Sequence, residues 1–83
     1  SQELQQAQAG YDEALKNLDN AKARANRYQG LADKGYVSSL QAQAERNGLE
    51  LATQRANAKR SELQAIALEH RASRSGLQLA GSQ

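Results

Sequence analysis

Apolar residues recur every seven positions along the first third of the chain. The first set of positions holds mostly large side chains, and the set three residues later holds mostly alanine: Leu4, Tyr11, Leu18, Ala25 and Ala32, then Ala7, Ala14, Ala21 and Tyr28. This a/d heptad pattern is typical of a helix that packs along a coiled-coil seam. Oppositely charged residues, Asp12 with Lys16 and Asp19 with Lys22, fit its outer faces as ion pairs. The pattern predicts a first helix from about residue 2 to about residue 33.

The pattern is interrupted at residues 34–38, which carry the signals that end one helix and start another. Gly35 can take the left-handed conformation that commonly closes a helix. Ser38 and Gln41 fit a capping box, and Val37 with Ala42 fits a hydrophobic staple. A connection this short places two helices antiparallel. The sequence therefore predicts a tip at 34–38, a second helix over about 39–72, and residue 1 opposite about residue 70.

The second predicted helix carries two apolar stripes on opposite faces. The first stripe is Leu49, Ala52, Ala56, Leu63 and Ile66, and the second is Val37, Leu40, Ala44, Leu51, Ala58, Ala65 and Leu68. Residues 49 and 51 lie about 200° apart on a helix, so only one stripe can pack on the first helix. The other stripe is either a solvent face made of good helix formers or a contact with a neighbouring hairpin. The pattern decays after Arg71, which predicts a frayed or helix-continuing end at 73–83.

Composition favours an elongated all-α protein over a compact domain. The 83 residues include no Pro, Phe, Trp or Met. A core made mainly of alanine buries too little area to stabilise a compact domain of this size, whereas small side chains let two helices approach closely. We therefore predict an all-α fold, two long antiparallel helices forming a coiled-coil hairpin over residues 1–72. We expect this chain to be a fragment of a longer protein.

The sequence offers little material for catalysis. It contains no cysteine, its net charge is +2, and its basic residues do not line one helix face, which argues against a nucleic-acid partner. The single histidine, His70, is expected to be solvated or to cap a helix C-terminus. No residues have the spacing of metal ligands or of a phosphate-binding loop. We expect no catalytic, metal-binding or cofactor-binding residues and no enzymatic activity. No apolar run approaches the roughly 20 residues that span a bilayer.

Two side chains near the bend are not needed to form it. Arg27 and Leu31 are i,i+4 neighbours that lie roughly 90–130° from the seam of the first helix. Ser38 arrives beside them from the second helix. In the ordinary interpretation Leu31 packs on Leu40, Arg27 is solvated and Ser38 only caps. The alternative is that Arg27, Leu31 and Ser38 form an outward-facing contact patch.

The spacing Arg27-x3-Leu31-x6-Ser38, within RYQGLADKGYVS at the tip of an Ala/Gln-rich hairpin, resembles the Arg-Leu-Ser tip motif of periplasmic adaptor proteins. These are the membrane fusion proteins of the HlyD type. The resemblance covers roughly residues 1–72 and does not extend to the lipoyl, β-barrel or membrane-proximal parts of such proteins. It implies a periplasmic hairpin, anchored to the inner membrane through parts outside this fragment.

The same resemblance implies partners and residue roles. Such adaptors bridge an inner-membrane exporter to a TolC-type outer-membrane channel, and their hairpins stand side by side in a six-membered ring. Arg27 would donate hydrogen bonds to the channel, Leu31 would fill a shallow apolar groove, and Ser38 would both cap and make a polar contact. The look of LADKGYVSSLQAQ favours an ABC exporter, as in type I secretion, with drug efflux as the other option. The alternative function is a generic coiled-coil spacer or dimerisation element whose tip has no specific role.

Overall fold

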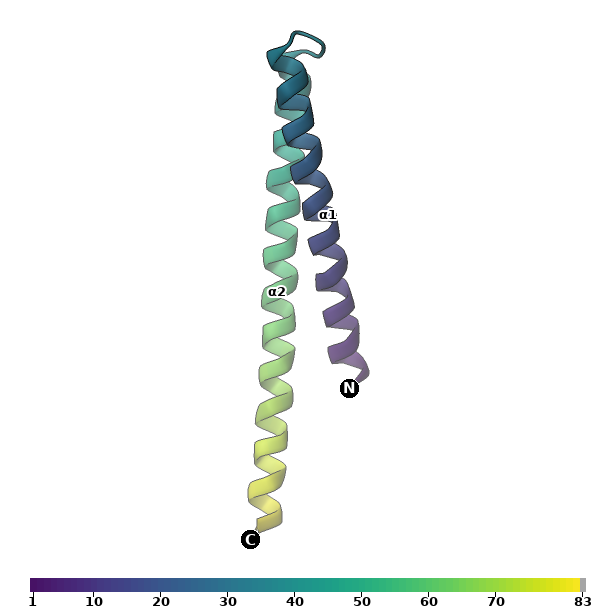
Figure 1. The fold of residues 1–83 in the computed structure, drawn as a ribbon. Coiled ribbons are helices and arrows are strands. Elements are labelled where there is room, and N and C mark those ends of the chain that lie inside the picture. The colour runs from purple at the N-terminus through teal and green to yellow at the C-terminus, as the bar shows by residue number, and fades with distance from the viewer. Residues whose placement is uncertain (83) are drawn as a thin grey trace.

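The computed structural model of this chain describes the backbone of residues 1–82 and the side chains of residues 1–74. It contains two α-helices, α1 (Gln2–Asp33) and α2 (Ser39–Ser82), joined by a five-residue connection. The helices run antiparallel and side by side, with the connection at one end of the molecule (Figure 1). The predicted all-α hairpin is confirmed.

The hairpin is a rod. Its principal extents are 72 × 15 × 13 Å, and its radius of gyration is 19.9 Å. A compact domain of this length would have a radius of gyration of about 12 Å. The helix α2 is the longer of the two and continues beyond the N-terminal end of α1 (Figure 1). The helix-continuing alternative for the end of the chain therefore describes the backbone up to Ser82, while Gln83 lies outside the described residues.

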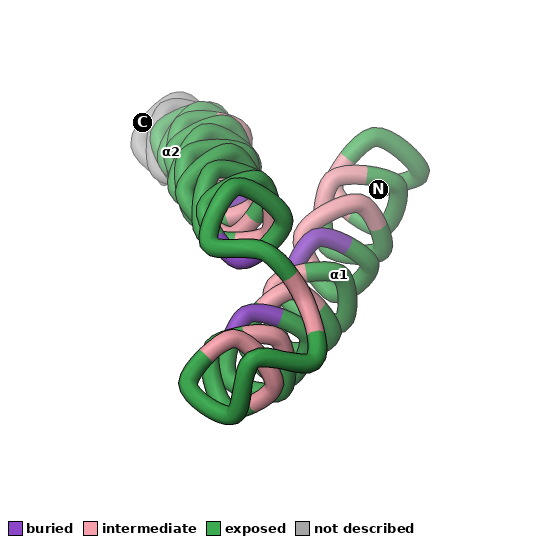
Figure 2. Tube along the Cα trace, turned by 90° about the horizontal axis from the view of Figure 1, so that it is seen from above, coloured by how far each residue is buried: buried purple, intermediate pink, exposed green. Residues whose placement is uncertain are grey.

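The contact between the helices is built mainly from alanine. Among the residues whose side chains are described, the buried ones are Ala14, Ala25, Ala42 and Ala56, each exposed by 8% or less. Every predicted seam residue of α1 is buried or half-buried, and so is every member of the stripe that runs from Leu49 to Ile66. An end-on view shows buried positions where the two helices face each other (Figure 2). The heptad pattern therefore predicted the packed face of α1, and the structure shows that the stripe from Leu49 to Ile66 is the packed face of α2.

The second stripe of α2 lies on the outside of the hairpin. Leu40, Leu51 and Leu68 are 78%, 54% and 62% exposed. The alanines between them, Ala44, Ala58 and Ala65, are also exposed, and only Val37 at the tip is half-buried. We call the residues Leu40, Ala44, Leu51, Ala58, Ala65 and Leu68 the outer stripe. Within the described part of the hairpin, the outer stripe does not pack on α1.

The far end of the rod shows how the two helices are aligned. Ser1 and Glu3 line a small cleft together with Ile66 and His70, as expected from a fold about residues 35–36. His70 is half-buried there, and α2 continues well past it. The prediction that His70 caps a helix C-terminus is therefore wrong, because the helix end lies elsewhere.

The charge pairs predicted on the outer face of α1 are not formed. Asp12 accepts a hydrogen bond from the amide of Gln8, with 3.1 Å between Nε2 and Oδ1. Among the described side chains, ion pairs join Arg24 to Glu45 and Lys59 to Glu62. Exposed i,i+4 pairs contribute only about 0.3–0.5 kcal/mol, so a neighbouring amide competes with them easily.

Candidate interaction site

The end of α1 is closed by a left-handed residue and two backbone hydrogen bonds. Gly35 has a φ of +80°. Its N–H donates to the carbonyl of Ala32 at 3.0 Å, and the N–H of Tyr36 donates to the carbonyl of Leu31 at 2.9 Å. This is the Schellman arrangement, which gives partners to carbonyls that have none within the helix. The predicted role of Gly35 in ending the helix matches this geometry.

The start of α2 is held by a reciprocal pair of side-chain bonds. The backbone N–H of Gln41 donates to Oγ of Ser38 at 3.0 Å. The backbone N–H of Ser38 donates to Oε1 of Gln41, also at 3.0 Å. The predicted capping box is therefore formed. Ser38 remains exposed, so its hydroxyl caps α2 while facing solvent.

Arg27 and Leu31 lie one helical turn apart near the end of α1, but they differ in burial. Arg27 is exposed, and within the described part of the chain it makes no hydrogen bond or ion pair. Leu31 is half-buried, so it is less outward-facing than its position off the seam suggested. The Schellman arrangement explains this, since it commonly pairs an apolar residue at the position of Leu31 with one at the position of Tyr36. The ordinary reason for Leu31 is thus local packing at the helix end.

The ordinary interpretation also expected Leu31 to pack on Leu40, and the exposure of Leu40 speaks against that. Leu40 is the most exposed large apolar residue of the described side chains, at 78%, and Tyr36 follows at 74%. Both belong to the tip or to the first turn of α2. Sequence reasoning did not single out Tyr36, although a tyrosine directly after a helix-closing glycine was visible.

A charged pair bridges the two helices just below the tip. The guanidinium of Arg24 donates to both carboxylate oxygens of Glu45, from Nε at 3.0 Å and from Nη2 at 2.8 Å. Its carbon Cζ also lies 5.6 Å from the centre of the Tyr28 ring, in cation–π range. Two-point recognition of a carboxylate by arginine fixes orientation as well as distance. Arg24 on α1 and Glu45 on α2 therefore align the two helices near the tip. Tyr28, on the same helix as Arg24, helps to orient the guanidinium.

This pair shifts the protonation of both partners. The hydrogen bond from Arg24 lowers the pKa of Glu45 below its ordinary 4.5; partial burial opposes this, and the charges of Arg24 and Arg27 add to the lowering. The hydrogen bond to Glu45 likewise raises the pKa of Arg24. Because the pKa of Glu45 is lower in the folded protein, the ionised carboxylate stabilises the fold at any pH above the pKa of Glu45 in the unfolded chain. This contribution is lost as the pH falls through the pKa of Glu45 in the folded protein. Glu45 is therefore ionised at neutral pH, as the bridge requires.

Sequence reasoning missed Glu45, although a signal for it existed. Extending the first stripe of α2 from Leu49 towards the tip by the same heptad spacing reaches Ala42 and Glu45. Ala42 is 1% exposed, and the Glu45 side chain is 22% exposed. A carboxylate at a seam position implies a partner on the facing helix. Only the alignment of the helices identifies that partner as Arg24.

A second polar bridge involves Arg46, in the first part of α2. Arg46 donates to the side-chain carbonyl of Gln29 on α1, and it also donates to Gln43 one turn earlier on α2 at 2.6 Å. Gln29 in turn donates to Asp33 at 3.0 Å. Together with the Arg24–Glu45 pair, this chain joins the two helices near the tip at two places. Side-chain hydrogen bonds therefore join the two helices just below the tip.

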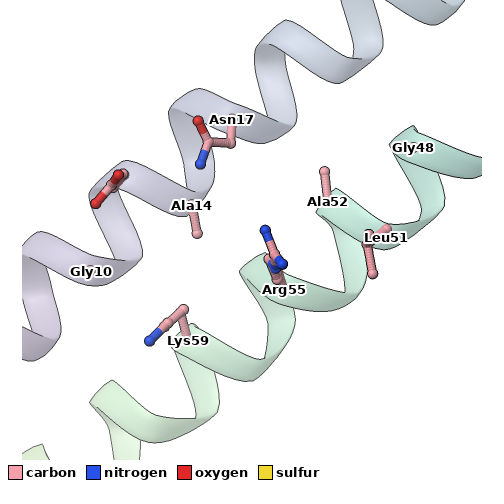
Figure 3. A pocket seen from close by; sticks show the side chains of 9 residues that line it. Gly10, Ala14, Asn17, Gly48, Leu51, Ala52, Arg55 and Lys59 are labelled. Atoms are coloured by element: carbon pink, nitrogen blue, oxygen red, sulfur yellow. The ribbon is translucent and has the colours of Figure 1, made fainter. Parts of the chain in front are cut away.

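A groove of about 370 Å³ runs between the helices near the middle of the rod (Figure 3). It is lined from α1 by Gly10, Glu13, Ala14 and Asn17, and from α2 by Gly48, Leu51, Ala52, Arg55 and Lys59. A Cβ atom added at Gly48 would meet nothing within 4 Å, and one at Gly10 would meet only Cδ of Lys59 at 3.9 Å. These glycines therefore leave open space between the helices. Leu51 belongs both to the groove and to the outer stripe, so the two features adjoin.

No described feature adds a catalytic or membrane-spanning element to this picture. Among the described side chains, no three His, Asp or Glu residues lie close enough together to hold a metal ion. None of the helical segments described is long and apolar enough to cross a bilayer. Comparisons with known protein families, with curated proteins and with solved structures gave no match.

Proposed function

We propose that this chain is the tip-bearing hairpin of a periplasmic adaptor of the HlyD type. Its tip docks onto a TolC-type outer-membrane channel, and the rest of the adaptor links that channel to an inner-membrane exporter of the ABC class. The observation that carries the proposal is the exposed Arg27, held beside a doubly capped bend at the end of a rod 72 Å long. The spacing of Arg27, Leu31 and Ser38 adds the resemblance to that family's tip motif.

The hydrogen bonding of the tip supports a docking role. The Schellman arrangement at Gly35, the capping box at Ser38 and the Arg24–Glu45 bridge satisfy the groups at both helix ends and join the two helices below the bend. A preorganised surface loses little conformational entropy on binding. Arg27 is not committed to a partner within the described chain, so its guanidinium is available to acceptors on another protein. A rod that ends in a rigid, partly apolar tip suits contact at a distance from its base.

The outer stripe supports the second part of the proposal, association with neighbouring copies. A tip of this size makes a small interface, and small interfaces are weak unless several copies bind together. Exposed leucines at Leu51 and Leu68 lie along the side of the rod, where a parallel neighbour would reach them. In the full-length adaptor, we propose that copies stand side by side in a ring of six. Contacts with the exporter belong to parts outside these residues.

The proposal is tested by changing the tip without changing the rod. In an adaptor that carries this hairpin, the double variant Arg27→Ala, Leu31→Ser should abolish export and cross-linking from the tip to the channel. Helicity, measured by circular dichroism, should stay unchanged. The matched control is Leu15→Ser, because Leu15 is a partly exposed leucine outside the seam and far from the tip. It should keep channel cross-linking.

Wild-type export by the double variant would show that the tip has no specific role. The chain would then be a coiled-coil spacer or dimerisation element. In that case the seam residues Leu18, Leu49 and Leu63 would determine function, and the tip would tolerate any substitution that preserves the turn.

A further inference from the structure

The tip exposes two large apolar side chains that the hairpin does not use. Tyr36 is 74% exposed and Leu40 is 78% exposed, more than the other exposed leucines along the rod. Tyr36 follows the left-handed Gly35, and Leu40 lies in the first turn of α2. An apolar residue is common at the position of Tyr36 in a Schellman arrangement, but here the side chains of Tyr36 and Leu40 both remain mostly exposed.

The backbone of both residues is held in place. The N–H of Tyr36 bonds the carbonyl of Leu31 at 2.9 Å, and Leu40 follows directly on the helix start that Ser38 caps. Tyrosine is enriched among the residues that dominate binding energy at protein interfaces. A fixed backbone below an exposed aromatic and an exposed aliphatic side chain gives a preorganised apolar surface.

The charges around these side chains indicate what kind of surface fits. Arg27 and Lys34 carry positive charge at the tip and Asp33 carries negative charge, an excess of one positive charge over residues 27–41. Among the described side chains, the ion pairs are Arg24–Glu45 and Lys59–Glu62, so neither Arg27 nor Lys34 is held in one. The net charge at the tip is therefore positive. A complementary partner surface is apolar at its centre and carboxylate-bearing at its edge.

We propose that Tyr36 and Leu40 form the apolar centre of the tip's docking surface and insert into an apolar groove of the partner channel that is edged by acidic side chains. This inference rests on the proposed function and names contact residues outside the Arg27, Leu31 and Ser38 set. Tyr36 and Leu40 supply the apolar area that binding removes from water. Arg27 orients the tip through attraction to the carboxylates at the edge of the groove.

The experiment measures binding of a purified TolC-type channel in detergent to this chain, immobilised through its C-terminal end at high density. Immobilisation supplies several copies at once, so the signal does not depend on self-association. Tyr36→Ser and Leu40→Gln should each weaken binding about tenfold or more. The matched control Leu15→Gln removes a partly exposed leucine of α1 away from the tip and should bind within about twofold of wild type. Leu40→Ala gives a second variant in case glutamine disturbs the helix start.

Each outcome decides between the two claims. Wild-type binding by both Tyr36→Ser and Leu40→Ala overturns this inference, and loss of binding by Arg27→Ala, Leu31→Ser in the same assay would then leave the proposed function standing. Equal weakening by the tip variants and by Leu15→Gln also overturns it, because the effect would not be specific to the tip. Absence of channel binding by the unmodified chain contradicts the proposed function itself, and this inference with it.

Discussion

Gly35 and Gly48 differ in why glycine matters at each position. Gly35 has a φ of +80°, a conformation that side chains with a Cβ atom rarely adopt. Gly48 lies inside α2 with helical geometry, and a Cβ atom there would meet nothing within 4 Å. One glycine is required by the backbone, and the other only lowers the helix propensity of its segment.

Replacing each glycine by alanine should therefore change stability in opposite directions. We expect Gly35→Ala to lower the free energy of unfolding by about 1–2 kcal/mol, the cost of the left-handed conformation for alanine. Gly48→Ala should raise it by about 0.5–1 kcal/mol, because alanine is the better helix former. Urea unfolding followed by circular dichroism measures both. A stabilising Gly35→Ala would mean that the bend does not need its left-handed residue.

The two helices are delimited by local signals and held together by few long-range ones. Each helix end at the tip satisfies its free backbone groups within a few residues, through Gly35 on one side and Ser38 on the other. Between the helices the buried contacts are alanines, which bury little area each. The polar bridges from Arg24 and Arg46 therefore matter for how the helices are oriented near the tip. Local capping forms the elements, and a small number of cross-helix contacts align them.

The cap at Ser38 gives a prediction for the element as a whole. Ser38→Ala should lower the free energy of unfolding by about 1 kcal/mol, because the N–H of Gln41 loses its acceptor. Ser38→Asp should keep the stability, since a carboxylate caps equally well. Ser39→Ala, one residue further and inside the helix, is the control and should have little effect. These values come from the same urea titrations.

The Ser38 series also separates capping from docking. If Ser38→Asp keeps the stability of the hairpin but loses channel binding, the hydroxyl makes a contact of its own with the partner. If it keeps both, the role of Ser38 is to start α2 and hold the tip in shape.

The whole molecule is a rod with one packed and one unpartnered face on its longer helix. The first stripe of α2 faces α1, and the outer stripe faces solvent together with the adjoining groove at Gly10 and Gly48. A two-helix hairpin with so small a seam gains stability when such a face is covered. The distribution of apolar residues over α2 therefore favours lateral assembly over an isolated hairpin.

Lateral assembly is tested by weakening the outer stripe. The double variant Leu51→Gln, Leu68→Gln should reduce the self-association of this chain at high concentration, measured by sedimentation equilibrium, because it removes two exposed leucines of the outer stripe. Leu15→Gln, a partly exposed leucine on α1, is the control and should leave self-association unchanged. If the double variant associates like wild type, the outer stripe is a solvent face.

The sequence by itself determined the helices, the bend and the packed face of α1, and it left two candidate faces on α2. Heptad spacing, Gly35 and the Ser38–Gln41 pair act over at most seven residues, so they can be read without knowing what lies opposite. The tertiary structure decided the contacts and burial of individual side chains that the pattern left open. In the structure Glu45 pairs with Arg24, Leu31 is half-buried, and Tyr36 and Leu40 are exposed to solvent. These outcomes depend on which face of one helix meets which face of the other, and that alignment is set by contacts between residues far apart in the chain.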